Sequence, residues 1–169
     1  MSIQNLVADW VADGAADISP KWLRKHGFGA VLADLDNTLA GYGTPEPCPE
    51  ILRWAASLRD AGIPLVIVSN NSEGRVSRFC APLGAPFIAK SGKPKPEGIL
   101  AAVALTGLPP EKVLMVGDQV FTDVRAAGRA GLRVVIVEPY TRGFWVRVRR
   151  VAENPFIYAA KRRQIKREH

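Results

Sequence analysis

Five short apolar runs, separated by segments of helical length, constrain the fold of this chain most strongly. The runs cover residues 29–34, 64–69, 86–89, 112–117 and 132–137. Residues 65–68 read Leu-Val-Ile-Val, without alternation of polar and apolar side chains, which is typical of a strand buried on both faces. Strands that alternate with helices predict an α/β fold, with a five-stranded parallel sheet and helices on both of its faces.

The segments between the apolar runs have the start and stop signals of helices. We expect helices at 50–60, 73–83, 96–106 and 122–130, each followed closely by a glycine. Residues 3–11 repeat apolar side chains at helical spacing and predict a short helix packed on the domain. The chain is therefore expected to form a single domain, residues 1–169, with an N-terminal helical segment (1–28), a core (29–139) and a C-terminal extension (140–169).

The composition of the 169 residues, 47% hydrophobic and 23% charged, is that of an ordinary globular domain. No apolar run is long enough to cross a bilayer, and Asp9 and Asp13 interrupt the apolar residues near the N-terminus, where a signal peptide would need a continuous run. A cytoplasmic location is expected. Cys48 and Cys80 have no metal-ligand spacing, so structural zinc and a disulfide framework are not expected.

The positive charge of the chain is concentrated in the C-terminal extension. Nine Lys/Arg and two Asp/Glu lie from Arg142 to His169, whereas the preceding residues contain fourteen of each sign. Aromatic residues such as Phe144 and Trp145 are interspersed among these cations. The mixture suits peripheral contact with an anionic membrane surface and would also suit RNA. A solvated helix end, or an edge strand or helix that covers the sheet, is the alternative interpretation.

Two acids, Asp34 and Asp36, follow the first apolar run directly. The carboxyl edge of an open α/β sheet is where ligands bind, and a divalent cation there would offset the repulsion between two carboxylates. Asp34 could act as a nucleophile on phosphorus, because carboxylates form aspartyl-phosphates. Asp36 could protonate the leaving oxygen and then deprotonate the attacking water. Asp and Asn are also common turn formers at strand ends.

Further polar side chains follow the next two strands. Ser69-Asn70-Asn71 comes after the second strand, where a hydroxyl and backbone N–H groups could hold phosphate oxygens or form a turn and helix cap. A lysine after the third strand could neutralise the acids and the transferring phosphoryl group. Lys93 is the preferred candidate, since Pro94 stiffens its loop, and Lys90 and Lys95 are the alternatives.

Two more acids lie after the fourth strand, in the sequence Gly117-Asp118-Gln119-Val120-Phe121-Thr122-Asp123. Asp118 is placed to bind a hard cation just past the strand. Asp123 comes near a helix start, where it could bind a metal-bound water or cap the helix. Since parallel strands end at the same edge of a sheet, all four polar clusters are expected to meet there.

The order of these clusters resembles the haloacid dehalogenase-like (HAD) superfamily. The resemblance rests on Asp34-Leu35-Asp36-Asn37-Thr38-Leu39, Ser69-Asn70-Asn71, Lys93-Pro94 and the Gly117–Asp123 segment. Within that superfamily these motifs resemble those of the YqeG-like branch of subfamily IIIA. That branch is itself similar to phosphatases that act on phosphatidylglycerophosphate. The three lysines between residues 90 and 96, and Arg125-Ala126-Ala127-Gly128, depart from that branch.

The resemblance implies a Rossmann-like core and Mg²⁺-dependent phosphomonoester hydrolysis through an aspartyl-phosphate. By similarity, the nucleophile is Asp34, the general acid/base is Asp36, and Lys93 steadies the intermediate. Ser69, with Asn70 and Asn71 beside it, would hold the phosphate. Mg²⁺ would lie between the Asp34 side chain, the Asp36 backbone carbonyl and Asp118, with Asp123 assisting.

The loops at 40–49 and 90–96 are too short to hold the cap domain that many HAD enzymes carry. An uncapped site predicts a bulky phosphorylated substrate, with phosphatidylglycerophosphate as one candidate. Phosphatases of soluble nucleotide, sugar or protein phosphates are the alternative within the family. A non-catalytic HAD-like module that binds RNA or protein through its basic extension is an alternative from another class.

Overall fold

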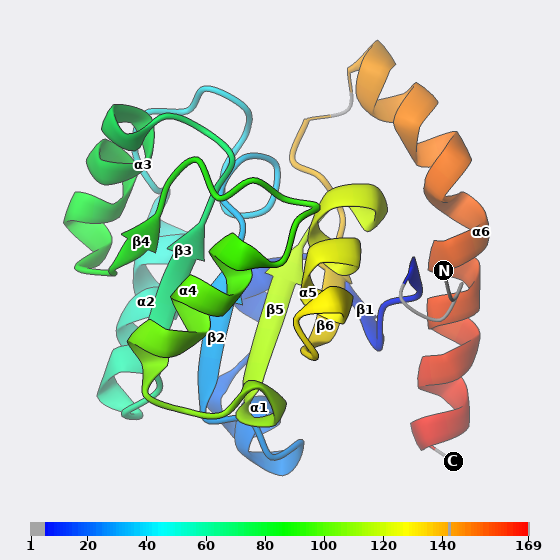
Figure 1. Ribbon diagram of the computed structural model, residues 1–169, viewed down its shortest axis with the longest axis horizontal. Coiled ribbons are helices and arrows are strands. Elements are labelled where there is room, and N and C mark those ends of the chain that lie inside the picture. Colours follow the sequence, from blue (N-terminus) through cyan, green and yellow to red (C-terminus); the bar gives the residue numbers. More distant parts are fainter. Residues whose placement is uncertain (1–5, 142, 169) are drawn as a thin grey trace.

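The protein is built on one parallel sheet of six strands, in the order β1-β6-β5-β2-β3-β4 (Figure 1). The computed structural model describes residues 6–141 and 143–168. The strands are β1 (Trp10–Ala12), β2 (Ala30–Ala33), β3 (Leu65–Val68), β4 (Phe87–Ile88), β5 (Val113–Gly117) and β6 (Arg133–Val137). The chain leaves β2 toward β3 on one side and later returns to β5 on the other. The carboxyl end of β2 is therefore a topological switch point, where α/β proteins bind ligands.

The predicted sheet of five strands is one strand short, because β1 lies in the segment that was predicted to be a helix. Trp10–Ala12 pairs in parallel with Val135–Val137 of β6. The Trp10 ring packs edge-on against Trp22, with ring centroids 5.2 Å apart. The free edge of β6 and this aromatic contact outweigh the local helical pattern, which is a weak constraint over so few residues. Residues 3–5 of the predicted helix lie outside the described part.

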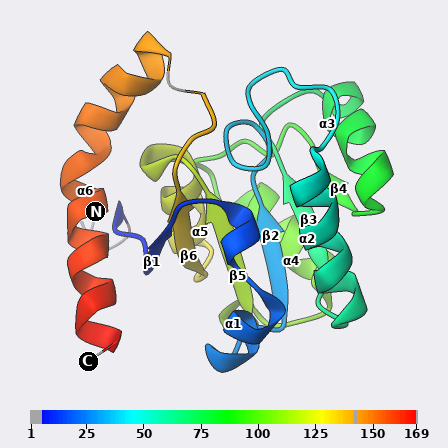
Figure 2. The same cartoon turned by 180° about the vertical axis from the view of Figure 1, so that it is seen from behind.

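Helices cover both faces of the sheet, as predicted. On one face the core contains Leu23 of α1 (Pro20–Lys25), Trp54 of α2 (Pro49–Asp60) and Phe79 of α3 (Glu73–Cys80). On the other it contains Ile99 of α4 (Glu97–Thr106) and Ala126 of α5 (Arg125–Arg129). Figure 1 looks onto the α4 and α5 side, and Figure 2 shows α1 and α2 from behind. Since β2 contributes Val31 to one core and Leu32 to the other, its unbroken apolar run is explained.

The C-terminal extension forms one long helix, α6 (Phe144–Glu168), which lies along the β1 edge of the sheet (Figures 1 and 2). Ile157 and Ala160 of α6 are buried in the core. The Val11 backbone N–H on the open edge of β1 donates to Oε1 of Gln164 at 3.0 Å. The extension is thus a helix that covers the sheet edge, and the covering residues lie farther along than Arg142–Arg150, for which the sequence suggested an edge strand or covering helix.

Both positions at which a cap domain could be inserted contain only loops, at 34–48 and 89–96. These two described loops are as short as predicted, and neither holds a cap domain. Within residues 6–141 and 143–168, none of the helices has the length and apolar character that crossing a membrane requires.

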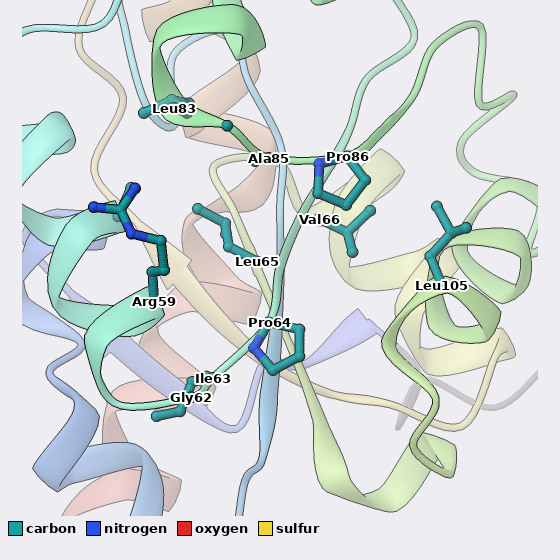
Figure 3. Close-up of a pocket in the computed structure, with 12 residues that line it drawn as sticks. Arg59, Gly62, Ile63, Pro64, Leu65, Val66, Leu83, Ala85, Pro86 and Leu105 are labelled. Atoms are coloured by element: carbon teal, nitrogen blue, oxygen red, sulfur yellow. The ribbon is translucent and has the colours of Figure 1, made fainter.

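A small hollow of about 260 Å³ lies at the opposite, amino end of the strands (Figure 3). It is lined by residues just before β3 and β4, among them Ile63, Pro64 and Pro86, and by Leu105 of α4. Arg59 is its one ionisable lining residue. No acid lines this hollow, so it has neither a nucleophile nor a metal ligand for phosphoryl transfer.

Candidate active site

The predicted polar clusters meet around a cavity of about 720 Å³ at the carboxyl ends of the strands. The acids and amides that line it come from the loops after β2, β3 and β5, Lys93 comes from the loop after β4, and one wall comes from α6. Its lining residues are Asp34, Asp36, Asn37, Tyr42, Ser69, Asn70, Asn71, Lys93, Gln119, Thr122, Asp123, Thr141, Trp145, Val146 and Arg149.

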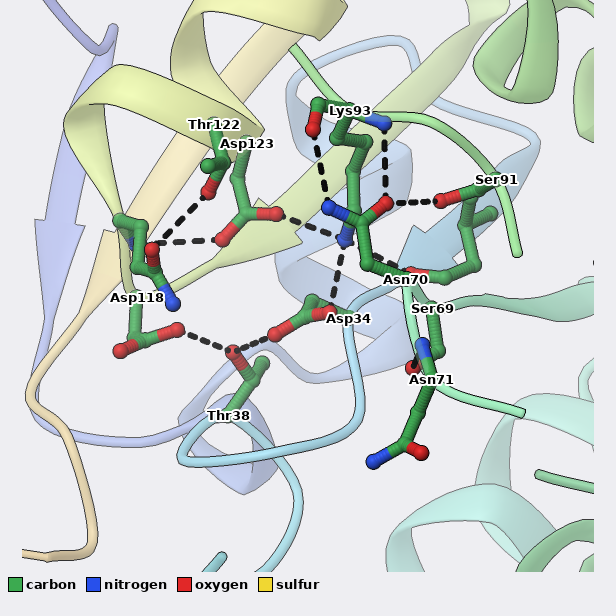
Figure 4. A network of polar contacts seen from close by, with 12 residues as sticks. Asp34, Thr38, Ser69, Asn70, Asn71, Ser91, Lys93, Asp118, Thr122 and Asp123 are labelled. Atoms are coloured by element: carbon green, nitrogen blue, oxygen red, sulfur yellow. Dashed lines mark hydrogen bonds and ion pairs between the residues drawn. The ribbon is translucent and has the colours of Figure 1, made fainter. Parts of the chain in front are cut away.

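Lys93 occupies the centre of the site, buried between two carboxylates (Figure 4). Its Nζ donates to Oδ1 of Asp34 at 2.7 Å, to Oδ1 of Asp123 at 2.8 Å and to the carbonyl of Val68 at 2.8 Å. These three bonds use every donor of an ammonium group. Lys90 and Lys95 are exposed, so of the three lysines only Lys93 reaches the acids.

The loop that presents Lys93 is fixed by Asn70. The Asn70 Oδ1 accepts from the Lys93 backbone N–H at 2.9 Å and from the Ser91 hydroxyl at 2.8 Å, and its Nδ2 donates to the Lys93 carbonyl at 2.9 Å. Asn70 was predicted to bind substrate, but its side-chain amide is turned to this loop. Ser69, on the same loop, accepts from the Asn71 backbone N–H at 3.1 Å.

Asp118 lies beside the Lys93–Asp34 ion pair and is linked to Asp34 through Thr38. The Thr38 hydroxyl is 3.2 Å from Oδ2 of Asp34 and 3.4 Å from Oδ1 of Asp118. Asn37 adopts a left-handed conformation, φ 64°, which asparagine tolerates well and which turns the chain sharply after Asp36. Thr38 therefore lies back toward the strand ends and bridges two carboxylates.

Asp123 reaches the site from a π-helical turn, η5 (Val120–Val124), which precedes α5. Such turns are rare and are frequently found at functional sites. Asp123 packs directly on Gly117. A Cβ added at Gly117 would lie 2.5 Å from the Cβ of Asp123. The glycine that ends β5 is thus required for Asp123 to lie against the strand. The backbone N–H of Gln119 donates to Oδ2 of Asp123 at 3.1 Å.

Burial and mutual repulsion shift the pKa values of this cluster. Burial, and then the charge of Asp123, raise the pKa of Asp34 to about 6, although Lys93 opposes the shift. Burial, and then Asp123 and Asp34, raise the pKa of Asp118 to about 8. Burial alone would lower the pKa of Lys93, but its two carboxylate partners raise it above the ordinary value. Lys93 is therefore protonated at neutral pH, whereas burial and mutual repulsion disfavour the charged forms of Asp34 and Asp118.

The donor set of the cluster fits a divalent cation. Asp34, Asp118 and Asp123 each offer a carboxylate oxygen, and the three atoms lie within 4.8 Å of one another. All three side chains are buried. Magnesium prefers oxygen ligands of this kind, and added positive charge would relieve the repulsion that raises the two pKa values.

Asp36 faces another part of the cavity from Asp34. Its carboxylate accepts from Nη2 of Arg75 at 2.9 Å and from Nδ2 of Asn71 at 3.0 Å. Arg75, on α3, also lies over the Phe79 ring, with its guanidinium carbon 5.6 Å from the ring centroid. The arginine that holds Asp36 was not among the predicted site residues, although its place one turn into the helix after Ser69-Asn70-Asn71 was a usable signal.

The α6 wall was also missed by sequence reasoning. Nη2 of Arg149 is 2.8 Å from Oδ2 of Asp118, and Arg150 donates to the Asp118 carbonyl at 3.0 Å. Buried Glu153 accepts from the Val120 backbone N–H at 2.9 Å and lies 3.7 Å from both arginines. Burial raises the pKa of Glu153, and the arginines oppose that shift. A lone acid three and four residues after two arginines was the available signal for this inward-facing cluster.

Comparisons with known proteins agree with this geometry. Residues 7–131 match the family model described as haloacid dehalogenase-like hydrolase. The chain belongs to this family. It is 36% identical over 86% of its length, and 86% of the relative's, to the "Probable phosphatase YqeG" of Bacillus subtilis. The predicted enzyme class, a HAD-type phosphatase, and the resemblance to the YqeG-like branch are thereby confirmed.

Two chloroplast-type relatives are more distant. The "Phosphatidylglycerophosphate phosphatase 1" proteins of Chlamydomonas reinhardtii and Arabidopsis thaliana are each 30% identical, over 70% and 83% of this chain. These matches cover 48% and 40% of those longer relatives. Their names describe those proteins, and they bear on the substrate of this chain only as a proposal.

Solved structures support the fold of this HAD-like chain. The cobalt-bound deoxy-D-mannose-octulosonate 8-phosphate phosphatase of Haemophilus influenzae has a TM-score of 0.56 at 15% identity, covering 80% of this chain and 91% of that one. CbbY of Rhodobacter sphaeroides, in complex with phosphate, has a TM-score of 0.50 at 20% identity, covering 68% and 88%. The Rossmann-like HAD fold is confirmed.

Proposed function

We propose that this HAD-type phosphatase is a Mg²⁺-dependent phosphomonoesterase that works through an aspartyl-phosphate on Asp34, and that its substrate is phosphatidylglycerophosphate. The observation that carries the chemistry is the buried Lys93 between Asp34 and Asp123, with Asp118 alongside. Lys93 and Arg149 together carry one positive charge fewer than the three acids they contact, which leaves negative charge for Mg²⁺ to balance. The substrate is proposed from the names of the two plant-type relatives.

In the first half of the reaction, a carboxylate oxygen of Asp34 attacks the phosphorus in line with the leaving oxygen. The P–O bond to the alcohol breaks, and Asp36 gives its proton to that oxygen. Lys93 neutralises charge on the phosphoryl oxygens throughout. Arg75 and Asn71 fix the direction in which Asp36 reaches into the cavity.

In the second half, Asp36 takes a proton from a water molecule, which attacks the phosphorus of the acyl phosphate. Inorganic phosphate leaves and the Asp34 carboxylate is restored. The Ser69 hydroxyl, with Asn71 on the same loop, would bind phosphate oxygens. Asp34, Asp118 and Asp123, with the Asp36 backbone carbonyl, would hold Mg²⁺, which supplies charge neutralisation at the transferring group.

A lipid substrate agrees with the open form of the site. The cavity of about 720 Å³ lies beneath short loops and α6 rather than a cap domain, so a phosphate attached to a bulky group can enter. A lipid substrate also requires the peripheral contact with an anionic membrane that the basic extension predicts. Soluble nucleotide, sugar or protein phosphates are the alternative substrates, and a module that binds RNA or protein is the non-catalytic alternative.

The test is phosphate release from phosphatidylglycerophosphate in mixed micelles and from a panel of soluble phosphomonoesters, with Mg²⁺ and with EDTA. We expect lipid turnover that is lost with EDTA and in Asp34→Asn. Turnover of soluble esters alone would keep the chemistry and discard the lipid. A folded protein that releases phosphate from none of these substrates would overturn the proposal.

A further inference from the structure

Over residues 144–153, α6 turns charged side chains inward and large apolar side chains outward, whereas Ile157 and Ala160 farther along are buried in the core in the ordinary way. Its inward face contains the Arg149, Arg150 and Glu153 cluster. Its outward face presents apolar side chains to solvent: Phe144 is 71% exposed, Trp145 79% and Val151 70%. A surface helix normally points its apolar stripe at the core and its charges outward. This reversal needs an explanation beyond the stability of the monomer.

The exposed side chains form a continuous stripe. Phe144, Val148, Val151, Pro155 and Tyr158 follow one another at spacings of four, three, four and three residues, which places them on one side of a helix. All five are exposed. Of the eleven large hydrophobic residues exposed in the described part of the chain, six belong to α6, so exposure is concentrated there. We call Phe144, Val148, Val151, Pro155 and Tyr158 the outer stripe.

Exposed cations flank the outer stripe. Arg147, Lys161 and Arg162 lie on the solvent side of α6. Between Phe144 and Ile165 there are six Lys/Arg and one Glu, and that glutamate is buried on the opposite face. The outer stripe therefore has three exposed cations near it and no exposed acid between Phe144 and Ile165. An apolar face with Trp and Phe and flanking Lys/Arg is the composition of helices that lie in a lipid interface.

The outer stripe begins at the cavity. Trp145, in the first turn of α6, lines the cavity, and its ring packs edge-on against Phe144 with centroids 5.4 Å apart. One turn later, Arg149 lines the cavity on the inward side. A surface bound along the outer stripe would thus lie next to the cavity entrance. We propose that the outer stripe and its flanking cations dock this protein on an anionic lipid bilayer.

A second copy of the chain is the competing occupant, since the outer stripe has the spacing of a coiled-coil seam. Pairing two such helices would bring Arg147, Lys161 and Arg162 of each against the same cations of the other, with no exposed acid on this part of α6 to offset them. Like charges across a helix pair are destabilising. Negative lipid head groups complement the same cations, each of which strengthens surface binding about fivefold.

This docking surface deepens the proposed function and rests on it, because a lipid substrate is the reason to bind a bilayer. Vesicle binding can nevertheless be measured without turnover. The full chain is sedimented with phosphatidylcholine vesicles, with and without phosphatidylglycerol. We expect binding only to the anionic vesicles. Val148→Ser with Val151→Ser should weaken it about tenfold or more, since two apolar side chains no longer enter the interface. Arg147→Gln, Lys161→Gln and Arg162→Gln together should weaken it roughly 100-fold.

Matched controls come from other helices of the protein. Leu100→Ser with Leu105→Ser removes two exposed apolar side chains of α4, and Lys21→Gln, Lys25→Gln and Arg53→Gln removes three exposed cations. These should leave vesicle binding unchanged, and all variants should hydrolyse a soluble phosphomonoester as the unaltered chain does. Equal vesicle binding by outer-stripe and control variants would overturn the proposal. So would a dimer in solution that the Val148 and Val151 changes dissociate. Vesicle binding without lipid turnover would support the docking surface while refuting the lipid substrate.

Discussion

The two walls of the cavity are built in different ways. On the sheet side, Lys93 is buried and its ammonium donors are all bound to groups set by strand ends. On the α6 side, Arg149 is half-buried with an ion pair to Asp118, and Trp145 is almost fully exposed. The sheet wall is buried, whereas the α6 wall is partly open to solvent through Trp145. A larger group attached to the phosphate would therefore contact the α6 wall. We therefore expect changes on the sheet side to abolish chemistry and changes on the α6 side to alter binding.

The largest effect is expected at Asp34. Asp34→Asn removes the proposed nucleophile but retains the size of the side chain, so turnover should fall roughly 10⁴-fold or more while the fold persists. Phosphate release in Mg²⁺ measures the rate, and circular dichroism checks the fold. A folded variant with a rate near that of the unaltered enzyme would rule out the aspartyl-phosphate and, with it, the distinction between the two walls.

A smaller loss is expected at Lys93. Lys93→Met leaves Asp34 and Asp123 without their shared cation, and kcat should fall about 10²–10³-fold because charge on the transferring phosphoryl is no longer neutralised. Lys95→Met is the matched control, since it removes an exposed cation from the same loop. Steady-state kinetics on one soluble ester compare the two. Equal losses would mean that the burial of Lys93 has no special role.

The pH dependence of Mg²⁺ binding tests the acids of the sheet wall together. Because the pKa of Asp118 is raised to about 8 and that of Asp34 to about 6, the metal-free protein retains protons that Mg²⁺ must displace. The affinity should rise with pH, by about tenfold per unit for each proton released, and level off above pH 8. Isothermal titration calorimetry in buffers of different ionisation enthalpy measures both the affinity and the protons released. An affinity that is flat between pH 6 and 8 would contradict these raised values.

The same pKa shifts affect the stability of the metal-free protein. An acid whose pKa is raised on folding retains its proton in the folded state after the unfolded chain has lost it. The free energy of unfolding without metal should therefore fall as the pH rises from about 4 to about 8. Added Mg²⁺ should reverse this trend, because it binds the ionised form of the folded protein.

The sheet wall was predicted from the sequence, whereas the α6 wall was missed, although Glu153 after Arg149 and Arg150 was a signal for it. Asp34, Lys93 and Asp118 each follow an apolar run, and parallel topology alone brings such positions to one edge. The choice of Lys93 over its neighbours depends on burial, which Asn70 decides through contacts 21 to 23 residues away in sequence. Local patterns do not contain that information.

The N- and C-terminal segments show why local patterns fail at the ends of the sheet. Trp10–Ala12 had a helical pattern but pairs with the open edge of β6. The cations of α6 were interpreted as one basic surface, yet Arg149 and Arg150 turn inward to Asp118 and Glu153 while Phe144, Val148 and Val151 face outward. In both cases a partner that is distant in sequence decides which side of the segment is buried. Asp118, which binds Arg149, is 31 residues away, so the local pattern of α6 does not contain this contact.

The smallest effect is expected at Arg149, where the two walls touch. Arg149→Met removes a charged side chain from the cavity and frees Asp118 Oδ2, but it leaves Lys93, Asp34 and Asp123 in place. KM should rise about tenfold, the value of one charged hydrogen bond, while kcat changes less. Arg147→Met, which removes an exposed cation two residues earlier, should leave soluble-ester kinetics unchanged. If Arg149→Met lowers kcat as strongly as Lys93→Met does, α6 takes part in the chemistry itself, and the contrast between a catalytic wall and a binding wall fails.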